Sequence, residues 1–349
     1  MSTIFELPSR IAMDTYQITA IFEDAHLVTF PARANEVVYQ AAYRSNVRLE
    51  HDCLEGACGS CKVLCTQGEF EIDDFSDEAL SDAERAQGYT LLCRMKAKTP
   101  CVVELPYPSS LLSTLKEPQW LDATVVSIEQ VASTVTRTVV RLKADGLDFL
   151  PGQYVHMSVP GSEVVRSYSF ANMPGQQDLE FFQKVYEQGA MSDYLRGRAA
   201  VGDEIRIKGP AGHFYLRPIR GPVLMVAGGT GLAPMLAMLR SIEAAGPTAQ
   251  PIHLIYGVNE ASEFFAQDVL AGFCQRLPLT IERIAVSGSG WQGPTGHVTS
   301  LLRPELLSAG DGDAYLCGPP PMIVAATDWL RDNGISDARI HAERFVSST

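Results

Sequence analysis

Four cysteines between Cys53 and Cys65 are the residues best suited to chemistry in this 349-residue sequence. Cys53, Cys58 and Cys61 follow the spacing C-x4-C-x2-C, and Cys93 lies 32 positions beyond Cys61. This spacing is typical of a [2Fe–2S] cluster held by four thiolates. The residues of the loop are mostly small, so backbone N–H groups can approach the sulfurs and offset the charge of a cluster. The sequence therefore predicts Cys53, Cys58, Cys61 and Cys93 as cluster ligands.

A zinc site is the main alternative for these cysteines. Structural zinc usually takes two close pairs of cysteines, whereas the fourth cysteine here has no near partner in the sequence. Disulfides are disfavoured in an intracellular protein, where thiols stay reduced. Zinc therefore stays open as the weaker alternative. The spare thiols of Cys65, Cys101 and Cys274 are interpreted as buried and inert.

A second group of residues could bind an anion beside an aromatic ring. In the segment RSYSF, Arg166 and Tyr168 alternate on one predicted strand. Arg166 can therefore offer a guanidinium to a pyrophosphate, while Tyr168 offers an aromatic face. The pattern R-x-Y-S is weak by itself, since an ordinary strand with a surface arginine also fits it.

Two turns between strands and helices could hold a dinucleotide. GGTGLAP, from Gly228 to Pro234, follows the apolar run VLMVA and precedes an amphipathic helix. CGPPP, from Cys317, also joins a predicted strand to a helix. Glycines let the backbone approach a ligand, and a helix N-terminus favours an anion. Ligands of parallel sheets bind at the carboxyl ends of the strands, which predicts that both turns lie on one edge. The first turn departs from the G-x-G-x-x-G fingerprint, and a turn that binds nothing is the alternative.

These residues require three kinds of scaffold. Residues 17–105 predict a small mixed domain, with a helix over NEVVYQAAYRSN that has Asn35 as its N-cap. Short, regularly spaced strands then predict an antiparallel barrel, and strand–helix alternation after Gly221 predicts a parallel sheet. Prolines between the first two domains favour an extended linker. The predicted boundaries are 1–105, 106–118 for the linker, 119–218 and 219–349.

Composition narrows the possible partners and location. The net charge of −13 makes nucleic acid a poor partner. No apolar run reaches the 18 or so residues of a membrane helix, and the first residues do not have the pattern of a secretion signal. We therefore expect a cytoplasmic protein that binds neither nucleic acid nor membrane.

The motifs and their order resemble a known family. Residues 15–105 resemble the plant-type ferredoxins, which have a β-grasp fold. RSYS, G-x-x-S, GGTG and CGPP, in that order, resemble the ferredoxin–NADP reductase superfamily, which pairs an antiparallel FAD barrel with a parallel-sheet nucleotide domain. Together they resemble the reductase components of ring-hydroxylating dioxygenases, above all those for benzoate and toluate.

The resemblance implies roles for individual residues. It implies that FAD and NADH bind at Arg166, Tyr168, Ser169, Gly189, Met191, Ser192, Gly228, Gly229, Thr230, Gly231, Cys317, Gly318 and Pro319. It also implies that Ser169, Cys317 and Glu343 lie at the reacting centre, with Cys317 as a packing contact rather than a nucleophile. Phe345 matches the aromatic that covers the flavin, although four residues follow it here.

The resemblance further implies that electrons pass from NADH through FAD and the [2Fe–2S] cluster to a Rieske-type oxygenase. Glu260 and Glu263, after the second strand of the nucleotide domain, favour NADH over NADPH. Glu260 is taken as a cofactor-binding residue, while the sequence leaves open which of the two glutamates faces the ribose. The segment from Glu69 to Glu84 holds eight acids in sixteen residues. It predicts a docking surface for the oxygenase, with an ordinary solvated segment as the alternative. A reductase for a diiron monooxygenase or a sugar-nucleotide dehydratase, and a zinc-stabilised interaction module, are the alternative functions.

Overall fold

The computed structural model describes residues 14–111, 119–307 and 312–345. The chain divides into two compact units, one ending at Lys116 and the other beginning at Glu117. Residues 112–118 of the predicted linker, and the four residues that follow Phe345, lie outside the described residues. Tyr107, at the start of the predicted linker, is buried in the first unit, where its hydroxyl accepts a hydrogen bond from the Glu50 N–H (3.0 Å).

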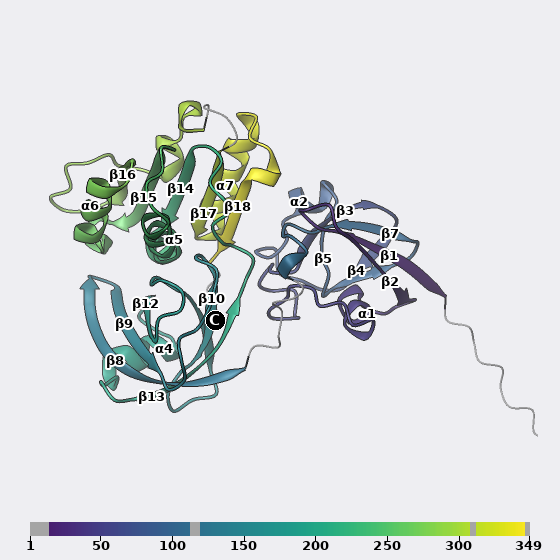
Figure 1. Cartoon of the computed structure of the whole chain (residues 1–349), viewed down its shortest axis with the longest axis horizontal. Helices are drawn as coiled ribbons and strands as arrows, with labels where there is room; N and C mark the ends of the chain where they lie inside the picture. The colour runs from purple at the N-terminus through teal and green to yellow at the C-terminus, as the bar shows by residue number, and fades with distance from the viewer. Residues whose placement is uncertain (1–13, 112–118, 308–311, 346–349) are drawn as a thin grey trace, which may run out of the picture. The chain divides into compact units, whose positions relative to one another are not determined.

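The first unit is built on a mixed five-stranded sheet beside a short helix (Figure 1). The strands run in the order β2-β1-β7-β3-β5, and β1 pairs with β7 in parallel while the other pairs are antiparallel. This is the predicted β-grasp fold. Its elements are β1 (Thr15–Ile21), β2 (Leu27–Arg33), α1 (Val38–Arg44), β3 (Lys62–Gln67), β4 (Phe70–Ile72), α2 (Asp82–Ala86), β5 (Tyr89–Leu91), β6 (Met95–Ala97) and β7 (Cys101–Glu104), with β4 and β6 forming a small separate pair.

Helix α1 buries one apolar face in the first unit. Val38, Ala41 and Ala42 are fully buried. The predicted N-cap is wrong, however, because the helix begins after Val37 and Asn35 has a left-handed backbone (φ +65°). Asn35 instead belongs to the turn that leads from β2 to the helix, where asparagine tolerates that conformation.

The second unit begins with six antiparallel strands that form the predicted barrel. Their order is β11-β10-β13-β8-β9-β12. The two end strands approach each other where the Ala171 N–H donates to the Glu180 carbonyl (3.0 Å). Apolar residues of these strands and of α4 fill the interior. The elements are β8 (Trp120–Ala132), β9 (Val135–Leu142), β10 (Tyr154–Ser158), β11 (Val165–Ser169), β12 (Asp178–Lys184), α4 (Ala190–Gly197) and β13 (Glu204–Ala211).

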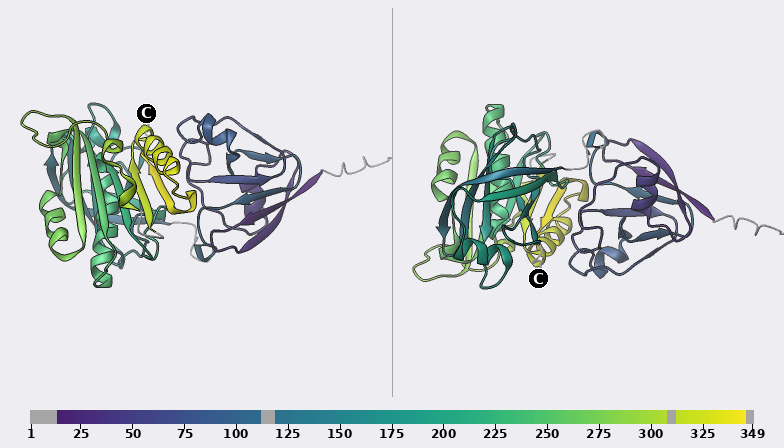
Figure 2. Two further views of the ribbon diagram at one scale, coloured as in Figure 1. Left: turned by 90° about the horizontal axis from the view of Figure 1, so that it is seen from above. Right: turned by 90° about the horizontal axis from the view of Figure 1, so that it is seen from below.

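The rest of the second unit is a five-stranded parallel sheet with helices on both faces (Figure 2). The strand order is β16-β15-β14-β17-β18, so the chain reverses direction across the sheet between β14 and β17. Helices α5 and α6 pack in one apolar cluster and α7 in another, on opposite faces. The elements are β14 (Val223–Gly228), η1 (Gly229–Gly231), α5 (Leu232–Ala245), β15 (Ile252–Glu260), η2 (Ala261–Glu263), α6 (Gln267–Arg276), β16 (Leu279–Ser287), η3 (Val298–Leu301), η4 (Pro304–Leu306), β17 (Asp313–Gly318), α7 (Pro320–Asp332), η5 (Asp337–Arg339) and β18 (Ile340–Arg344).

Strand β14 shows why this sheet has two cores. Val223, Met225 and Ala227 face the cluster of α5 and α6, while Leu224 and Val226 face the cluster of α7. A continuous apolar run is therefore needed, as expected for a central parallel strand. Within the described residues, no helix is long and apolar enough to span a membrane.

Candidate functional site

The cysteine loop of the first unit turns its backbone toward the sulfurs. Leu54, Gly56 and Gly59 all have positive φ angles (+58°, +75° and +77°), which wind the chain tightly. The N–H groups of Glu55 and Ala57 donate to the Cys53 sulfur, each at 3.4 Å. The predicted approach of loop N–H groups to the sulfurs is therefore present.

The four predicted ligands meet as two pairs of thiols. The Cys58 thiol is hydrogen-bonded to Cys53, and this contact lowers the pKa of Cys53 to about 5. Cys61 is likewise hydrogen-bonded to Cys93. In the parts of the chain that the structure describes, no three His, Cys, Asp or Glu side chains converge on a site for one ion. Two pairs suit a cluster in which each iron takes two thiolates, whereas zinc takes all four ligands at one point.

Strand β11 carries the residues predicted to hold FAD. Arg166 is half-buried, and its guanidinium donates to the Val165 carbonyl (2.9 Å). Tyr168 packs against the barrel core, where burial raises the pKa of its hydroxyl. Ser169 is buried at the end of the strand, opposite Tyr154 of β10. Of the three predicted residues on this strand, Arg166 and Tyr168 are therefore partly exposed and Ser169 is buried.

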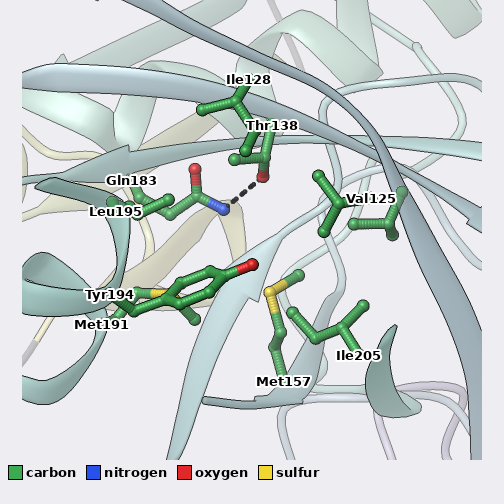
Figure 3. Close-up of a pocket in the computed structure, with 10 residues that line it drawn as sticks. Val125, Ile128, Thr138, Met157, Gln183, Met191, Tyr194, Leu195 and Ile205 are labelled. Atoms are coloured by element: carbon green, nitrogen blue, oxygen red, sulfur yellow. Dashed lines mark hydrogen bonds between the residues drawn. The ribbon is translucent and has the colours of Figure 1, made fainter. Parts of the chain in front are cut away.

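The turn into α4 carries the next three predicted residues. Gly189 is the N-cap of α4 and has φ +129°, a conformation that favours glycine. The Ser192 hydroxyl accepts a hydrogen bond from the Tyr186 N–H (3.0 Å). The Met191 side chain points into the barrel, so only its backbone can face a ligand beyond the helix N-terminus (Figure 3). The same interior holds a hydrogen bond from the Gln183 amide to the Thr138 hydroxyl (2.6 Å).

The two predicted nucleotide turns pack backbone to backbone. They follow the neighbouring strands β14 and β17, as predicted. A Cβ atom on Gly231 would lie 2.1 Å from the Cys317 carbonyl oxygen, and one on Gly228 would lie 2.9 Å from Pro319. Gly229, with φ +54°, faces open space instead. The close contact requires glycine, and the open position leaves room for a ligand at the helix N-terminus.

The end of β18 lies beside the second turn. Cys317 is fully buried and pairs in register with Glu343. Burial, with a smaller effect of Glu343, raises the pKa of the Cys317 thiol well above its ordinary value. The thiol is therefore neutral, which agrees with a packing role rather than a nucleophilic one. The Phe345 N–H donates to the Gly318 carbonyl (2.9 Å), and the half-buried ring packs against the apolar cluster of α5 and α6.

The two acids after β15 lie in different surroundings. Glu263 is buried and accepts hydrogen bonds from Thr134 and Lys184 of the barrel segment, each at 2.9 Å. Burial alone raises the pKa of Glu263, but these two donors outweigh it and lower the pKa. Glu260 is exposed and is hydrogen-bonded to Ser287. Of the two acids, only Glu260 is therefore placed to meet a ligand from solvent.

An ionic cluster that the sequence analysis missed joins the barrel to the nucleotide-binding half. Arg240 of α5 contacts the Glu180 carboxylate (2.5 Å) and also donates to the Ala171 carbonyl. Arg137 of β9 contacts the other oxygen of Glu180. No local pattern indicates this cluster, because Arg240 and Glu180 are sixty positions apart.

Comparisons with known proteins match these three parts in order. Residues 21–98 match the 2Fe-2S iron-sulfur cluster binding domain, 122–215 the oxidoreductase FAD-binding domain and 225–328 the oxidoreductase NAD-binding domain. The toluate 1,2-dioxygenase electron transfer component of Pseudomonas putida is 37% identical, over 96% of this chain and 99% of that protein. The 2-halobenzoate 1,2-dioxygenase electron transfer component of Burkholderia cepacia is 35% identical, over 95% and 98%.

This chain belongs to the family of dioxygenase electron transfer components. It is an oxidoreductase whose cofactors are a [2Fe–2S] cluster, FAD and NADH. Its fold is also that of the Amycolatopsis cytochrome P450 reductase, which is 26% identical with a TM-score of 0.70, over 96% of this chain and 100% of that one. The paired thiols, the glycine turns and the strand that carries Arg166 fit the three cofactors.

Proposed function

We propose that this protein supplies electrons from NADH to a Rieske-type dioxygenase that acts on an aromatic carboxylate such as benzoate. The observation that carries the proposal is the paired arrangement of Cys53 with Cys58 and Cys61 with Cys93, in a chain that also has both nucleotide-binding domains. The 37% identity to the toluate enzyme's component supports the class of substrate.

The residues of the second unit would bind and align the two nucleotides. FAD, when bound, accepts a hydride from NADH and releases electrons one at a time to the cluster. Arg166 is proposed to neutralise its pyrophosphate, while the N-terminus of α4 at Gly189 and Ser192 adds backbone donors. Tyr168 and Ser169 would hold the ring, with Phe345 on its other side. No residue in this scheme acts as a general acid or base.

The turns η1 and Cys317–Pro319 would hold the nicotinamide end of NADH. Gly229 leaves space for close approach, and Thr230 would lie near the flavin, a proposal supported by the contact of η1 with β12 of the barrel. Glu260 would accept hydrogen bonds from the adenosine ribose hydroxyls and would repel a 2′-phosphate. Glu343 would stand behind Cys317, so that the pair shapes the ring pocket without forming a covalent bond.

The acidic segment from Glu69 to Glu84 would dock the oxygenase. It packs on the cluster loop, because the Ser76 N–H donates to the Gly56 carbonyl (3.0 Å) and Ala79 lies against Gly59. Four of its acids already pair with bases of the same unit, and these are Glu71, Asp73, Asp82 and Glu84. Asp74 and Asp77 are exposed beside the same loop and offer charge to a basic partner. Docking here would bring the cluster close to its acceptor.

An anaerobic spectral titration tests the cofactor arrangement. We expect a red-brown protein that bleaches with NADH and shows the electron paramagnetic resonance signal of a reduced two-iron cluster. A yellow protein without iron would refute the assignment of the four cysteines, and a colourless zinc protein would refute the whole scheme.

Reconstitution with the oxygenase component of a benzoate-type dioxygenase tests the partner. We expect NADH-dependent dihydroxylation of the aromatic carboxylate, with an apparent KM for the oxygenase that rises several-fold in D74K/D77K. The control is E23K, an exposed acid of the same unit outside the acidic segment. Equal KM values for both variants would refute docking through the acidic segment.

A second candidate partner is an oxygenase of another class. The full-length similarity to a cytochrome P450 reductase favours it, because the same three-part architecture occurs there. Turnover with a P450 or diiron oxygenase, and none with the Rieske enzyme, would select this candidate. The cytoplasmic location stays a prediction that rests on the composition of the sequence and its first residues.

A further inference from the structure

Two thiols outside the cluster meet across neighbouring strands of the first unit. Cys65 lies on β3 and Cys101 at the start of β7, and these strands pair in antiparallel fashion. The Cys101 thiol is hydrogen-bonded to the Cys65 sulfur. The register shifts between Cys65 and Gln67, where β3 carries an extra residue. Both thiols were interpreted from the sequence as buried and inert, and 36 positions separate them.

A glycine makes room for this contact. Gly68 has φ +98°, and a Cβ atom there would lie 2.7 Å from the Cys101 sulfur and 2.3 Å from the Pro100 carbonyl oxygen. A side chain at position 68 would therefore collide with Cys101 and push it from its place. Carbonyl groups surround both sulfurs, with Thr99 3.3 Å from Cys101 and Gln67 3.2 Å from Cys65.

The two thiols differ in their access to solvent. Cys65 is half-buried, whereas Cys101 is only 1% exposed. A small oxidant from solvent can therefore reach the Cys65 sulfur before it reaches the more buried Cys101 sulfur. The hydrogen bond from Cys101 is the largest cause that lowers the pKa of Cys65, and it outweighs the effect of burial. A lower pKa increases the fraction of thiolate, which is the form that attacks peroxides.

We propose that Cys65 and Cys101 form a peroxide-responsive dithiol. The Cys65 thiolate attacks hydrogen peroxide, the O–O bond breaks, and Cys65 becomes a sulfenic acid with release of hydroxide. Cys101 then attacks that sulfur and displaces its hydroxyl group, so that an S–S bond forms. The two thiols lose two electrons and two protons in total, and one peroxide is reduced to two waters.

The fold offers a reason for the bond to be reversible. A disulfide brings its sulfurs closer than a hydrogen-bonded pair, so β3 and β7 must shift slightly. The bulge after Cys65 is the part of β3 with the fewest ladder constraints and can take up that shift. Strained, accessible disulfides are the easily reduced ones. Since β3 begins at Lys62, directly after Cys61, the bond would tether the strand that carries a cluster ligand.

The test uses the full-length protein with its cofactors bound. The protein is treated with about one equivalent of hydrogen peroxide, quenched with N-ethylmaleimide and digested without reductant for mass spectrometry. We expect a peptide pair linked through Cys65 and Cys101, equal loss of alkylation at both residues, unchanged cluster absorbance and full reversal by dithiothreitol. Cys274, which is exposed on α6, serves as an internal control and should stay alkylated to a larger extent.

Single substitutions at Cys65 and Cys101 distinguish disulfide formation from independent oxidation of the two thiols. In C65S, Cys101 should stay alkylated after peroxide, and in C101A, Cys65 should advance to sulfinic acid instead of a disulfide. Oxidation of Cys65 in the wild-type protein while Cys101 stays alkylated would overturn the proposal. Loss of the cluster before either thiol reacts would overturn it as well. Cluster absorbance and the linked peptide are separate readouts, so failure of the iron–sulfur assignment would be recognised independently.

Discussion

Replacing Gly231 by alanine tests whether the two turns must touch for hydride transfer. The new Cβ would lie 2.1 Å from the Cys317 carbonyl oxygen and 2.6 Å from its carbon. Ordinary contacts are about 3.5 Å, so one turn must withdraw by roughly 1.4 Å. Gly231 has an ordinary helical backbone (φ −59°), so the collision is the only penalty. A misplacement of about 1 Å between reactants lowers a rate by about 100-fold.

The assay is anaerobic stopped-flow reduction of the bound flavin by NADH. We expect G231A to keep its FAD and its cluster but to reduce the flavin about 100-fold more slowly at saturating NADH. The matched control is G246A at the other end of α5, where φ is +103° and no atom lies within contact distance of the new Cβ. G246A should lose roughly 1–3 kcal/mol of stability, because φ +103° with ψ −174° is a conformation that essentially only glycine adopts, and should lose no hydride-transfer rate. A G231A protein that transfers hydride at the wild-type rate would refute the reasoning.

Three further substitutions test the electrostatics of the two units. E180Q should lower the free energy of unfolding by about 2 kcal/mol in a denaturant titration followed by flavin fluorescence, because Arg137 and Arg240 lose their shared carboxylate; no change would contradict this. Burial raises the pKa of Glu50 from 4.5 to about 7. Below pH 4.5 the carboxyl is protonated in both the folded and the unfolded protein, and its contribution to stability is fully present. As the pH rises to 7 the unfolded state ionises first, so the free energy of unfolding falls by about 3 kcal/mol in all. E50Q should remove this pH dependence of stability, measured as thermal unfolding followed by the circular dichroism of the cluster. Stability profiles against pH that run parallel for E50Q and the wild type would contradict the prediction. E260R should raise kcat/KM for NADPH at least ten-fold over the wild type, and an unchanged preference would exclude Glu260 as the ribose contact.

The parts of this protein that could be predicted from sequence are those set by local spacing and periodicity. The C-x4-C-x2-C loop needs only short-range turns, which positive φ angles at Leu54, Gly56 and Gly59 provide. The glycine turns follow apolar strands whose neighbours are determined by the handedness and order of a parallel sheet. The small mixed domain, the barrel and the parallel sheet were therefore predicted in their correct order, and the resemblance to plant-type ferredoxins implied the β-grasp fold of the first.

The parts that could not be predicted depend on residues far apart in the chain. Glu260 and Glu263 look equivalent in sequence, and only Thr134 and Lys184, which lie on another domain, separate their roles. Asn35 has the residue type of an N-cap, yet it lies in a turn with φ +65°, and Val37, which forms a bridge with Lys96, is the N-cap two residues later. In both cases the tertiary arrangement decides between local options that are nearly equal in energy.

Two side-chain contacts join the barrel to the nucleotide-binding half of the second unit. Arg240 holds the Ala171 carbonyl, two residues beyond Ser169, while Glu263 receives Lys184 at the end of β12. Both contacts join the barrel, whose strand β11 is proposed to carry FAD, to the half that carries η1, where NADH is proposed to bind. The relative position of the two nucleotides would therefore depend on side chains that touch neither of them. A change at Arg240 should then appear in the rate of hydride transfer more than in the KM for NADH, since the binding turns themselves stay intact.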